Sequence, residues 1–275
     1  MPIISIHAAS KAYAEATLPI SSTEVVTSGS GLVEGTATVM AANGPLELFH
    51  ARPQEEGPWP IILVISEVFG VHAHIADICR RFAKLGFLAV APELFSRHGD
   101  PRQLKSIPEI ISQIVAKVPD HEVLADLDAA ALWAQQAGGD KSRLAVNGYC
   151  WGGRIAWLYA AHNRDVKSAI AWYGRLEGTK SALTPLHPVD VANSLYAPVL
   201  GLYAGQDAGI PPDSVERLHA LLAHGNRFAR ESELVVYSDA QHAFFADYRA
   251  SYHAESAIDG WARCLNWLRK SRVLN

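Results

Sequence analysis

Most of the chain alternates between short apolar runs and longer amphipathic segments. The runs are "PIILVIS" (60–66), "FLAVAPE" (87–93), "RLAVNGY" (143–149), "KSAIAWYG" (167–174), "APVLGLYAG" (197–205) and "ELVVYSD" (233–239). A run that is apolar at nearly every position is typical of a strand covered on both faces. The amphipathic segments, which predict helices, span 74–86, 120–138, 152–162, 213–224 and about 254–270. This alternation predicts an α/β fold, with a mostly parallel sheet and helices on both faces.

Local signals refine three of these elements. Residues 74–86 end at Gly86, which indicates a glycine C-cap. Residues 120–138 begin with Asp120, interpreted as an N-cap, and end in glycine. Before the first apolar run, "TATVMA" and "LELFHAR" predict an antiparallel pair of strands joined at "ANGP".

The N-terminal region differs from the rest. Residues 1 to about 34 are rich in Ser, Thr, Ala and Gly and show no strong periodicity. We therefore expect a partly irregular N-terminal extension, residues 1–44, followed by one domain over residues 45–275. A single domain is reasonable because α/β folds often reach this size undivided.

Composition narrows the class of protein. The 275 residues are 49% hydrophobic and 19% charged, with a formal net charge of −4, which gives no electrostatic reason to expect nucleic acid. No apolar run approaches the roughly 20 residues that cross a bilayer, and the N-terminus reads poorly as a secretory signal. The three cysteines, an odd number, argue against a disulfide framework. We expect a cytoplasmic protein, monomer or small homo-oligomer, that binds neither nucleic acid nor membrane.

The sequence around Cys150 is the first candidate for chemistry. Cys150 follows an apolar run and precedes a predicted helix, within "GYCWGG" (148–153). This is a G-x-nucleophile-x-G pattern, in which a sharp strand-to-helix turn raises the nucleophile above the sheet. Side chains at Gly148 and Gly152 would collide with the neighbouring strand and helix. The alternative is a buried structural cysteine.

Two further strand ends supply partners for a nucleophile. Asp207 follows the run at 197–205, and His242 lies in the loop after the last predicted strand. Nucleophile, acid and histidine in this chain order are typical of α/β-hydrolases. An acid here would orient the histidine. Rivals remain in each role: Asp190 and Asp213 as acids, and His72, His74 and His253 as histidines.

The end of the run at 60–66 contributes the remaining groups. The backbone N–H groups of Val68 and Trp151 are candidates for an oxyanion hole. Glu67 is a carboxylate directly after an apolar run, so it needs a partner or a shifted pKa. It could bond the Cys150 thiol; the alternative is an ion pair with Arg80, Arg81 or Arg97.

The motifs together resemble the dienelactone hydrolase family, the cysteine-nucleophile branch of the α/β-hydrolases. They are "SEVFG", "APELFSR", "GYCWGGR", "AWYG", "GQD" and "DAQHAF", and the resemblance covers roughly residues 45 to 270. It implies a catalytic triad of Cys150, His242 and Asp207, with Glu67 engaging the thiol. The implied activity is that of a carboxylic ester hydrolase of the carboxymethylenebutenolidase type, which makes residues 45–275 the catalytic domain.

The expected substrate site departs from the family in one place. Arg97 matches an arginine that the family uses for a substrate carboxylate, but Ala246 stands where a second arginine is expected. An apolar aromatic rim is expected from Trp151, Trp172, Tyr173 and Phe95, each of which could equally be core.

The function predicted from sequence is cleavage of a small ester or enol-lactone through a thioester on Cys150. No cofactor and no metal is predicted. A general carboxylesterase is one alternative, and a thiol-based redox or binding protein on the same fold is another.

Overall fold

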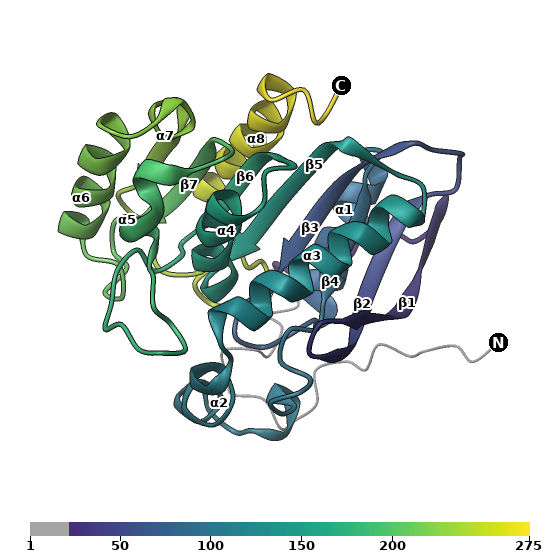
Figure 1. Ribbon diagram of the computed structural model, residues 1–275, viewed down its shortest axis with the longest axis horizontal. Coiled ribbons are helices and arrows are strands. Elements are labelled where there is room, and N and C mark those ends of the chain that lie inside the picture. The colour runs from purple at the N-terminus through teal and green to yellow at the C-terminus, as the bar shows by residue number, and fades with distance from the viewer. Residues whose placement is uncertain (1–21) are drawn as a thin grey trace.

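The computed structural model describes residues 22–275, and an eight-stranded sheet runs through the middle of that region (Figure 1). The strands are β1 (Leu32–Ala41), β2 (Gly44–Pro53), β3 (Trp59–Ile65), β4 (Leu88–Pro92), β5 (Gly139–Tyr149), β6 (Val166–Trp172), β7 (Val199–Ala204) and β8 (Glu233–Tyr237). Their order across the sheet is β1-β2-β4-β3-β5-β6-β7-β8. β1, β2 and β4 pair antiparallel and the remaining neighbours pair parallel. This is an α/β-hydrolase fold, as predicted.

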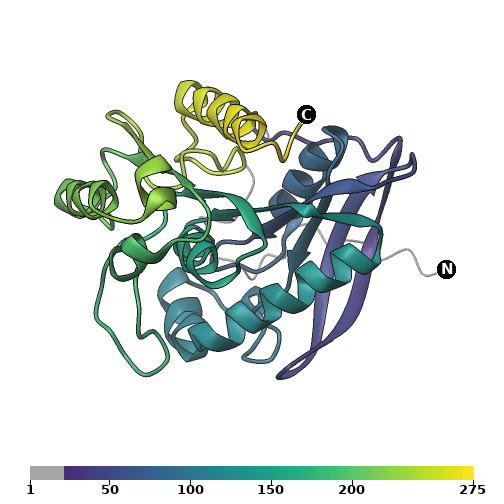
Figure 2. The same cartoon turned by 45° about the horizontal axis from the view of Figure 1, so that its top comes forward.

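The longer helices cover both faces of the sheet. They are α1 (Ala73–Lys84), α3 (Asp120–Gln136), α4 (Trp151–His162), α6 (Pro212–Ala223) and α8 (Ala254–Lys270). Figure 2 shows α1 and α8 on one side of the sheet and α3 on the other. Because β3 is covered on both faces, it is apolar throughout, and all six of its residues after Trp59 are buried.

The predicted strands and long helices are confirmed within one or two residues at most ends. Gly86 follows α1 with a φ of 96°, as a glycine at a helix C-terminus does. The N-cap assigned to Asp120 is wrong, because Pro119 occupies that position and Asp120 is the first helical residue. The Asp120 carboxylate instead accepts two hydrogen bonds of 2.7 Å from Arg154 on α4.

Several short elements are absent from the sequence-based prediction. They are the helices α2 (Ile107–Gln113), α5 (Pro188–Val191) and α7 (Arg227–Glu231), and the 3₁₀ turns η2 (Pro101–Gln103), η3 (Val115–Lys117) and η4 (Ala192–Ser194). Each spans seven residues or fewer, which is too short for a helical period to be recognised.

The start of the described region lies against α1 and the sheet. The backbone N–H of Thr27 donates to Asp77 at 2.5 Å, and β1 is the edge strand of the same sheet as the rest of the domain. The predicted boundary between residues 44 and 45 falls at the start of β2, inside the β1–β2 pair, and stays a prediction. The first 21 residues of the predicted extension lie outside the described residues.

Candidate active site

Cys150 occupies a strained turn between β5 and α4. Its φ of 53° and ψ of −115° lie outside the regions that non-glycine residues usually adopt. A Cβ at Gly148 would come within 2.0 Å of the Gly152 carbonyl oxygen, and one at Gly152 within 2.4 Å of the Ile65 carbonyl oxygen. The glycines on both sides of Cys150 are therefore required by backbone contacts, as the sequence pattern predicts.

The structure brings Cys150, His242 and Asp207 together from three separate loops. The Nε2 atom of His242 lies 3.1 Å from the Cys150 Sγ, and its Nδ1 atom lies 2.5 Å from Asp207 Oδ2. Asp207 is almost completely buried, whereas the His242 side chain is 36% exposed. The loop carrying Asp207 is closed by a 2.8 Å hydrogen bond from the Gly209 N–H to Oδ1 of the same carboxylate.

The surroundings of His242 favour its charged form. Burial alone lowers the pKa of a histidine, but here negative charge on the Cys150 sulfur and the hydrogen bond with Asp207 outweigh it. Together they raise the pKa of His242 to about 10. The His242 ring thus has a carboxylate at one nitrogen and the Cys150 sulfur at the other.

The backbone N–H groups of Val68 and Trp151 are the expected donors of an oxyanion hole. Among residues 22–275, neither amide donates to a recorded hydrogen bond, and that of Trp151 is at the first position of α4, where a helix has no internal acceptor. Both residues pack against the same small apolar cluster, which includes Phe69 and Ile110 of α2. The α2 segment thus covers the loop that carries Val68.

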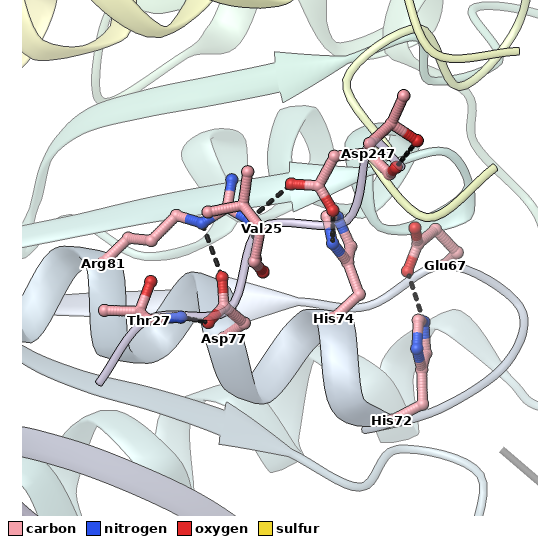
Figure 3. Close-up of polar contacts among 9 residues, drawn as sticks. Val25, Thr27, Glu67, His72, His74, Asp77, Arg81 and Asp247 are labelled. Atoms are coloured by element: carbon pink, nitrogen blue, oxygen red, sulfur yellow. Dashed lines mark hydrogen bonds and ion pairs between the residues drawn. The ribbon is translucent and has the colours of Figure 1, made fainter. Parts of the chain in front are cut away.

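Glu67 contacts His72, which the sequence suggested only as an alternative to His242. Its Oε2 atom lies 3.2 Å from Nε2 of His72, the residue before α1 (Figure 3). No hydrogen bond between Glu67 and Cys150 is recorded among the described residues. Burial alone raises the pKa of Glu67, but the hydrogen bond to His72 and the nearby imidazoles lower it to about 2. The carboxylate is therefore ionised, with its Oε1 atom buried and unpaired among the described residues.

The arginines considered as partners of Glu67 are engaged elsewhere. Arg80 pairs with Glu34, Arg81 with Asp77 and Asp247, and Arg97 with Glu122 and Asp126. The resemblance to the family implies that Arg97 binds a substrate carboxylate. In the structure, its guanidinium already pairs with two carboxylates of α3. A substrate carboxylate would have to compete with both.

The segment after His242 is tied to α1 by a network that sequence reasoning missed. Asp247 accepts a hydrogen bond from Arg81 and lies 3.3 Å from His74 Nδ1, and Arg81 also binds Asp77 one turn away (Figure 3). Ala246, at the position of the expected second arginine, is completely buried. In the sequence, the acidic residue directly after Ala246, Asp247, was the only indication of this network.

The expected aromatic rim is not formed by three of its four members. Trp172, Tyr173 and Phe95 are 0% exposed, and only Trp151 is partly accessible. Trp172 packs against Phe245 at 4.4 Å between ring centroids and donates to Asn147, so it belongs to the core. Tyr173 nevertheless contacts the His242 ring edge-on, with a centroid distance of 5.2 Å.

The rival residues lie in other contacts. Asp190 accepts from Lys180 and from the His187 N–H, and His253 lies 2.8 Å from Ser256 at the start of α8. Asp213 stands in the first turn of α6, and His74 faces Asp247. None of these is recorded in contact with Cys150.

No group of three or more His, Cys, Asp or Glu side chains within residues 22–275 is arranged to hold a metal ion. No helix in this region is long and apolar enough to span a bilayer.

Comparison with known proteins places the chain among relatives that share both sequence and fold. The model of the dienelactone hydrolase family matches residues 46–272. The Escherichia coli K12 protein named "Putative carboxymethylenebutenolidase" is 52% identical over 259 residues, or 94% of this chain and 94% of that one. A protein of the same name from Methylorubrum extorquens is 51% identical, over 95% of this chain and 89% of that one.

Solved structures of similar proteins share the fold of this chain. The crystal structure named "Putative Dienelactone Hydrolase" from Klebsiella pneumoniae is 52% identical and superposes with a TM-score of 0.84, covering 87% of this chain and 99% of that one. A dienelactone hydrolase-like phosphotriesterase from metagenomic libraries, at 18% identity, shares the fold with a TM-score of 0.71. The chain belongs to the dienelactone hydrolase family.

Proposed function

We propose that this protein hydrolyses small esters or lactones by nucleophilic catalysis, with Cys150 as nucleophile, His242 as acid and base, and Asp207 as the residue that orients His242. The observation that carries the proposal is the continuous contact from Cys150 Sγ through the imidazole to Asp207, at 3.1 Å and 2.5 Å. The chain also belongs to a family named for a hydrolase.

In the first half of the reaction the Cys150 sulfur attacks the substrate carbonyl carbon and forms an S–C bond. The N–H groups of Val68 and Trp151 stabilise the negative charge that develops on the carbonyl oxygen. The ester C–O bond then breaks, and protonated His242 gives its proton to the departing alkoxide. The product of this half is a thioester on Cys150 and a free alcohol.

In the second half water replaces the alcohol. Neutral His242 accepts a proton from water as the water oxygen bonds to the thioester carbon, and the S–C bond breaks. The carboxylic acid leaves, and the thiolate–imidazolium pair is restored. The buried Asp207 keeps Nδ1 of His242 hydrogen-bonded throughout, so Nε2 always faces the sulfur.

Glu67 has a different part in this scheme from the one expected from the family. Its ionised carboxylate is held by His72, which leaves the Cys150 sulfur to pair with His242 alone. We propose that His72 keeps Glu67 away from the nucleophile in this conformation.

The substrate class follows from the arginines. Since Arg97 is neutralised by Glu122 and Asp126 and Ala246 has no charge, the site is proposed to accept esters without a free carboxylate. A redox role for Cys150 is less favoured, because the other two cysteines, Cys79 and Cys264, are completely buried and neither can reach the surface as a resolving thiol.

The test replaces Cys150 with alanine and measures hydrolysis of p-nitrophenyl acetate. We expect a loss of about 10³-fold or more in kcat, since removal of a nucleophile leaves only binding and the oxyanion hole. Cys79→Ala is the matched control and should keep the activity of the wild type. Undiminished hydrolysis by the Cys150→Ala protein would reject the nucleophile, and a strong preference for carboxylate-bearing esters would reject the substrate class alone.

A further inference from the structure

A pocket lies where β6 and β7 begin, at the opposite end of these strands from Cys150. It has a volume of about 470 Å³ and is bordered by the first residues of β6, the segment before β7, α7 and the end of α8. Figure 1 shows α7 and the C-terminal end of α8 at the edge where β6 and β7 begin. Cys150 follows the carboxyl end of β5, and β6 alone spans about 20 Å between the two edges. The pocket is therefore separate from the proposed catalytic site.

The charge of this pocket is opposite to that of the chain. Its lining holds five cationic side chains and one carboxylate, that of Glu231, although the protein has a formal net charge of −4. The cations are Arg164, Lys167, Arg227, Lys270 and Arg272. A concave surface of one sign raises the local concentration of ions of the other sign.

Most of this charge is not neutralised by the protein. Within residues 22–275, only two of the cations have carboxylate partners: Arg227 lies 3.1 Å from Glu231, and Lys270 lies 2.5 Å from Glu233. The side chains of Lys167 and Arg272 make no recorded polar contact with residues 22–275. Both are exposed, so their charges face solvent within reach of the pocket.

Arg164 is positioned by a ring rather than by an acid. Its guanidinium carbon lies 4.5 Å from the centroid of Tyr196, and its Nη2 donates to the Tyr196 hydroxyl at 3.2 Å. Aromatic rings also lie under the other two paired cations, Phe228 under Arg227 and Trp267 under Lys270. A cation–π contact fixes the place of a cation without cancelling its charge, which is what an anion-binding site needs.

Helix ends account for only part of the cluster. Lys270 and Arg272 lie at the end of α8, where basic side chains stabilise the helix dipole. The other three cations come from different parts of the chain and border the same pocket: Arg164 from the loop between α4 and β6, Lys167 from β6 and Arg227 from α7. The convergence is the feature that a solvated helix end does not explain.

We propose that this pocket binds a small polyanion carrying two or more phosphate or carboxylate groups. Arginine forks and lysine ammonium groups recognise both kinds of oxyanion, and several cations are needed to balance a multiply charged ligand. The pocket volume suits a compact molecule rather than an extended chain. The proposal does not depend on the reaction at Cys150.

Isothermal titration calorimetry of the full chain tests the proposal, with inorganic pyrophosphate and citrate as separate probes. We expect saturable binding of at least one probe at about 0.02 M salt, weakening at about 0.3 M salt as the charges are screened. The double variant Lys167→Gln/Arg272→Gln should bind about tenfold more weakly or worse. Arg164→Gln is a second variant that gives the same result if the double variant does not fold.

The matched control is Lys105→Gln/Lys117→Gln, which removes two exposed cations outside the pocket. It should bind the probe like the wild type. Binding of pyrophosphate alone indicates a phosphate ligand, and binding of citrate alone a carboxylate ligand. The proposal is overturned if neither probe binds, or if the control loses as much affinity as the pocket variants.

Discussion

The charge of His242 depends on Cys150 as well as on Asp207. Both the negative charge of the sulfur and the hydrogen bond to Asp207 raise the pKa of the imidazole, against the effect of burial. Because the folded-state pKa of about 10 is above the ordinary value of 6.5, the resulting stabilisation is complete below about pH 6.5. It is lost as the pH rises through about 10.

We therefore expect Cys150→Ser to lower the pKa of His242 from about 10 toward 6.5, because a serine hydroxyl has no charge to stabilise the imidazolium. An NMR titration of the imidazole resonances measures this directly. Cys264→Ala, which removes a buried thiol in α8, should leave the titration unchanged. An unchanged pKa in the Cys150→Ser protein would mean that the sulfur is not the source of the shift.

Single positions differed in how far the sequence could predict them. The glycine pattern and the chain order of Cys150, Asp207 and His242 reflect backbone geometry, so they were visible as motifs. The partner of Glu67 was not, because His72 reaches it only through the bend between β3 and α1. The burial of Trp172 was also hidden, since it results from contacts with rings far along the chain, such as Phe245.

A buried ion pair joins the start of α3 to α4. Arg154 makes two hydrogen bonds to Asp120 and one to the Leu186 carbonyl oxygen, and both charged side chains are over nine-tenths buried. Removing one partner of a buried pair leaves the other charge without compensation. The pair lies at the first residue of α3, one position after the N-cap Pro119.

We expect Asp120→Asn to lower the free energy of unfolding by about 3–5 kcal/mol. Urea denaturation followed by circular dichroism measures the change. Glu177→Gln removes a carboxylate from a largely exposed pair with Arg217 and should cost about 1 kcal/mol or less. Equal small effects of the two substitutions would show that the Asp120–Arg154 pair does not hold the helices together.

The long helices were predictable because their apolar period repeats several times. The strands β3 to β8, of five to eleven residues, were predictable because each contains a continuous apolar run. The helix α2 has a capping box, formed by Ser106 just before it and Glu109 within it. It has fewer than two helical turns after Pro108. Its place over Val68 depends on tertiary contacts with Phe69 and Trp151. Such an element is determined by the site it covers, and local sequence alone does not specify it.

The stability of the folded protein should also depend on pH through Glu93, a buried carboxyl group directly after β4. Burial raises its pKa, against a 2.9 Å hydrogen bond from the Val71 N–H, from 4.5 to about 7. Its Oε1 atom has no partner among the described residues, and a Cβ at Gly70 would lie 2.4 Å from it. Through its hydrogen bond with Val71, Glu93 supports the loop that follows Glu67 and Val68.

The direction of the pH dependence follows from the number of protons that the folded and unfolded proteins bind. Between the unfolded pKa near 4.5 and the folded pKa of about 7, the folded protein binds more protons than the unfolded one, so stability falls as the pH rises. Above the folded value the loss is constant, at about 3 kcal/mol. Glu93→Gln removes this titration, and the amide oxygen of glutamine can still accept from Val71.

We therefore expect the Glu93→Gln protein to gain stability relative to the wild type as the pH rises, with little difference near about pH 4.5 and the largest difference above about pH 8. Urea denaturation of both proteins across this range measures the difference and cancels contributions from other groups, including His242. Glu216→Gln, an exposed change on α6, should give a difference that does not vary with pH. If the Glu93→Gln difference were equally flat, Glu93 would titrate normally in the folded protein, and the loop before α1 would be supported by its apolar contacts rather than by this carboxyl group.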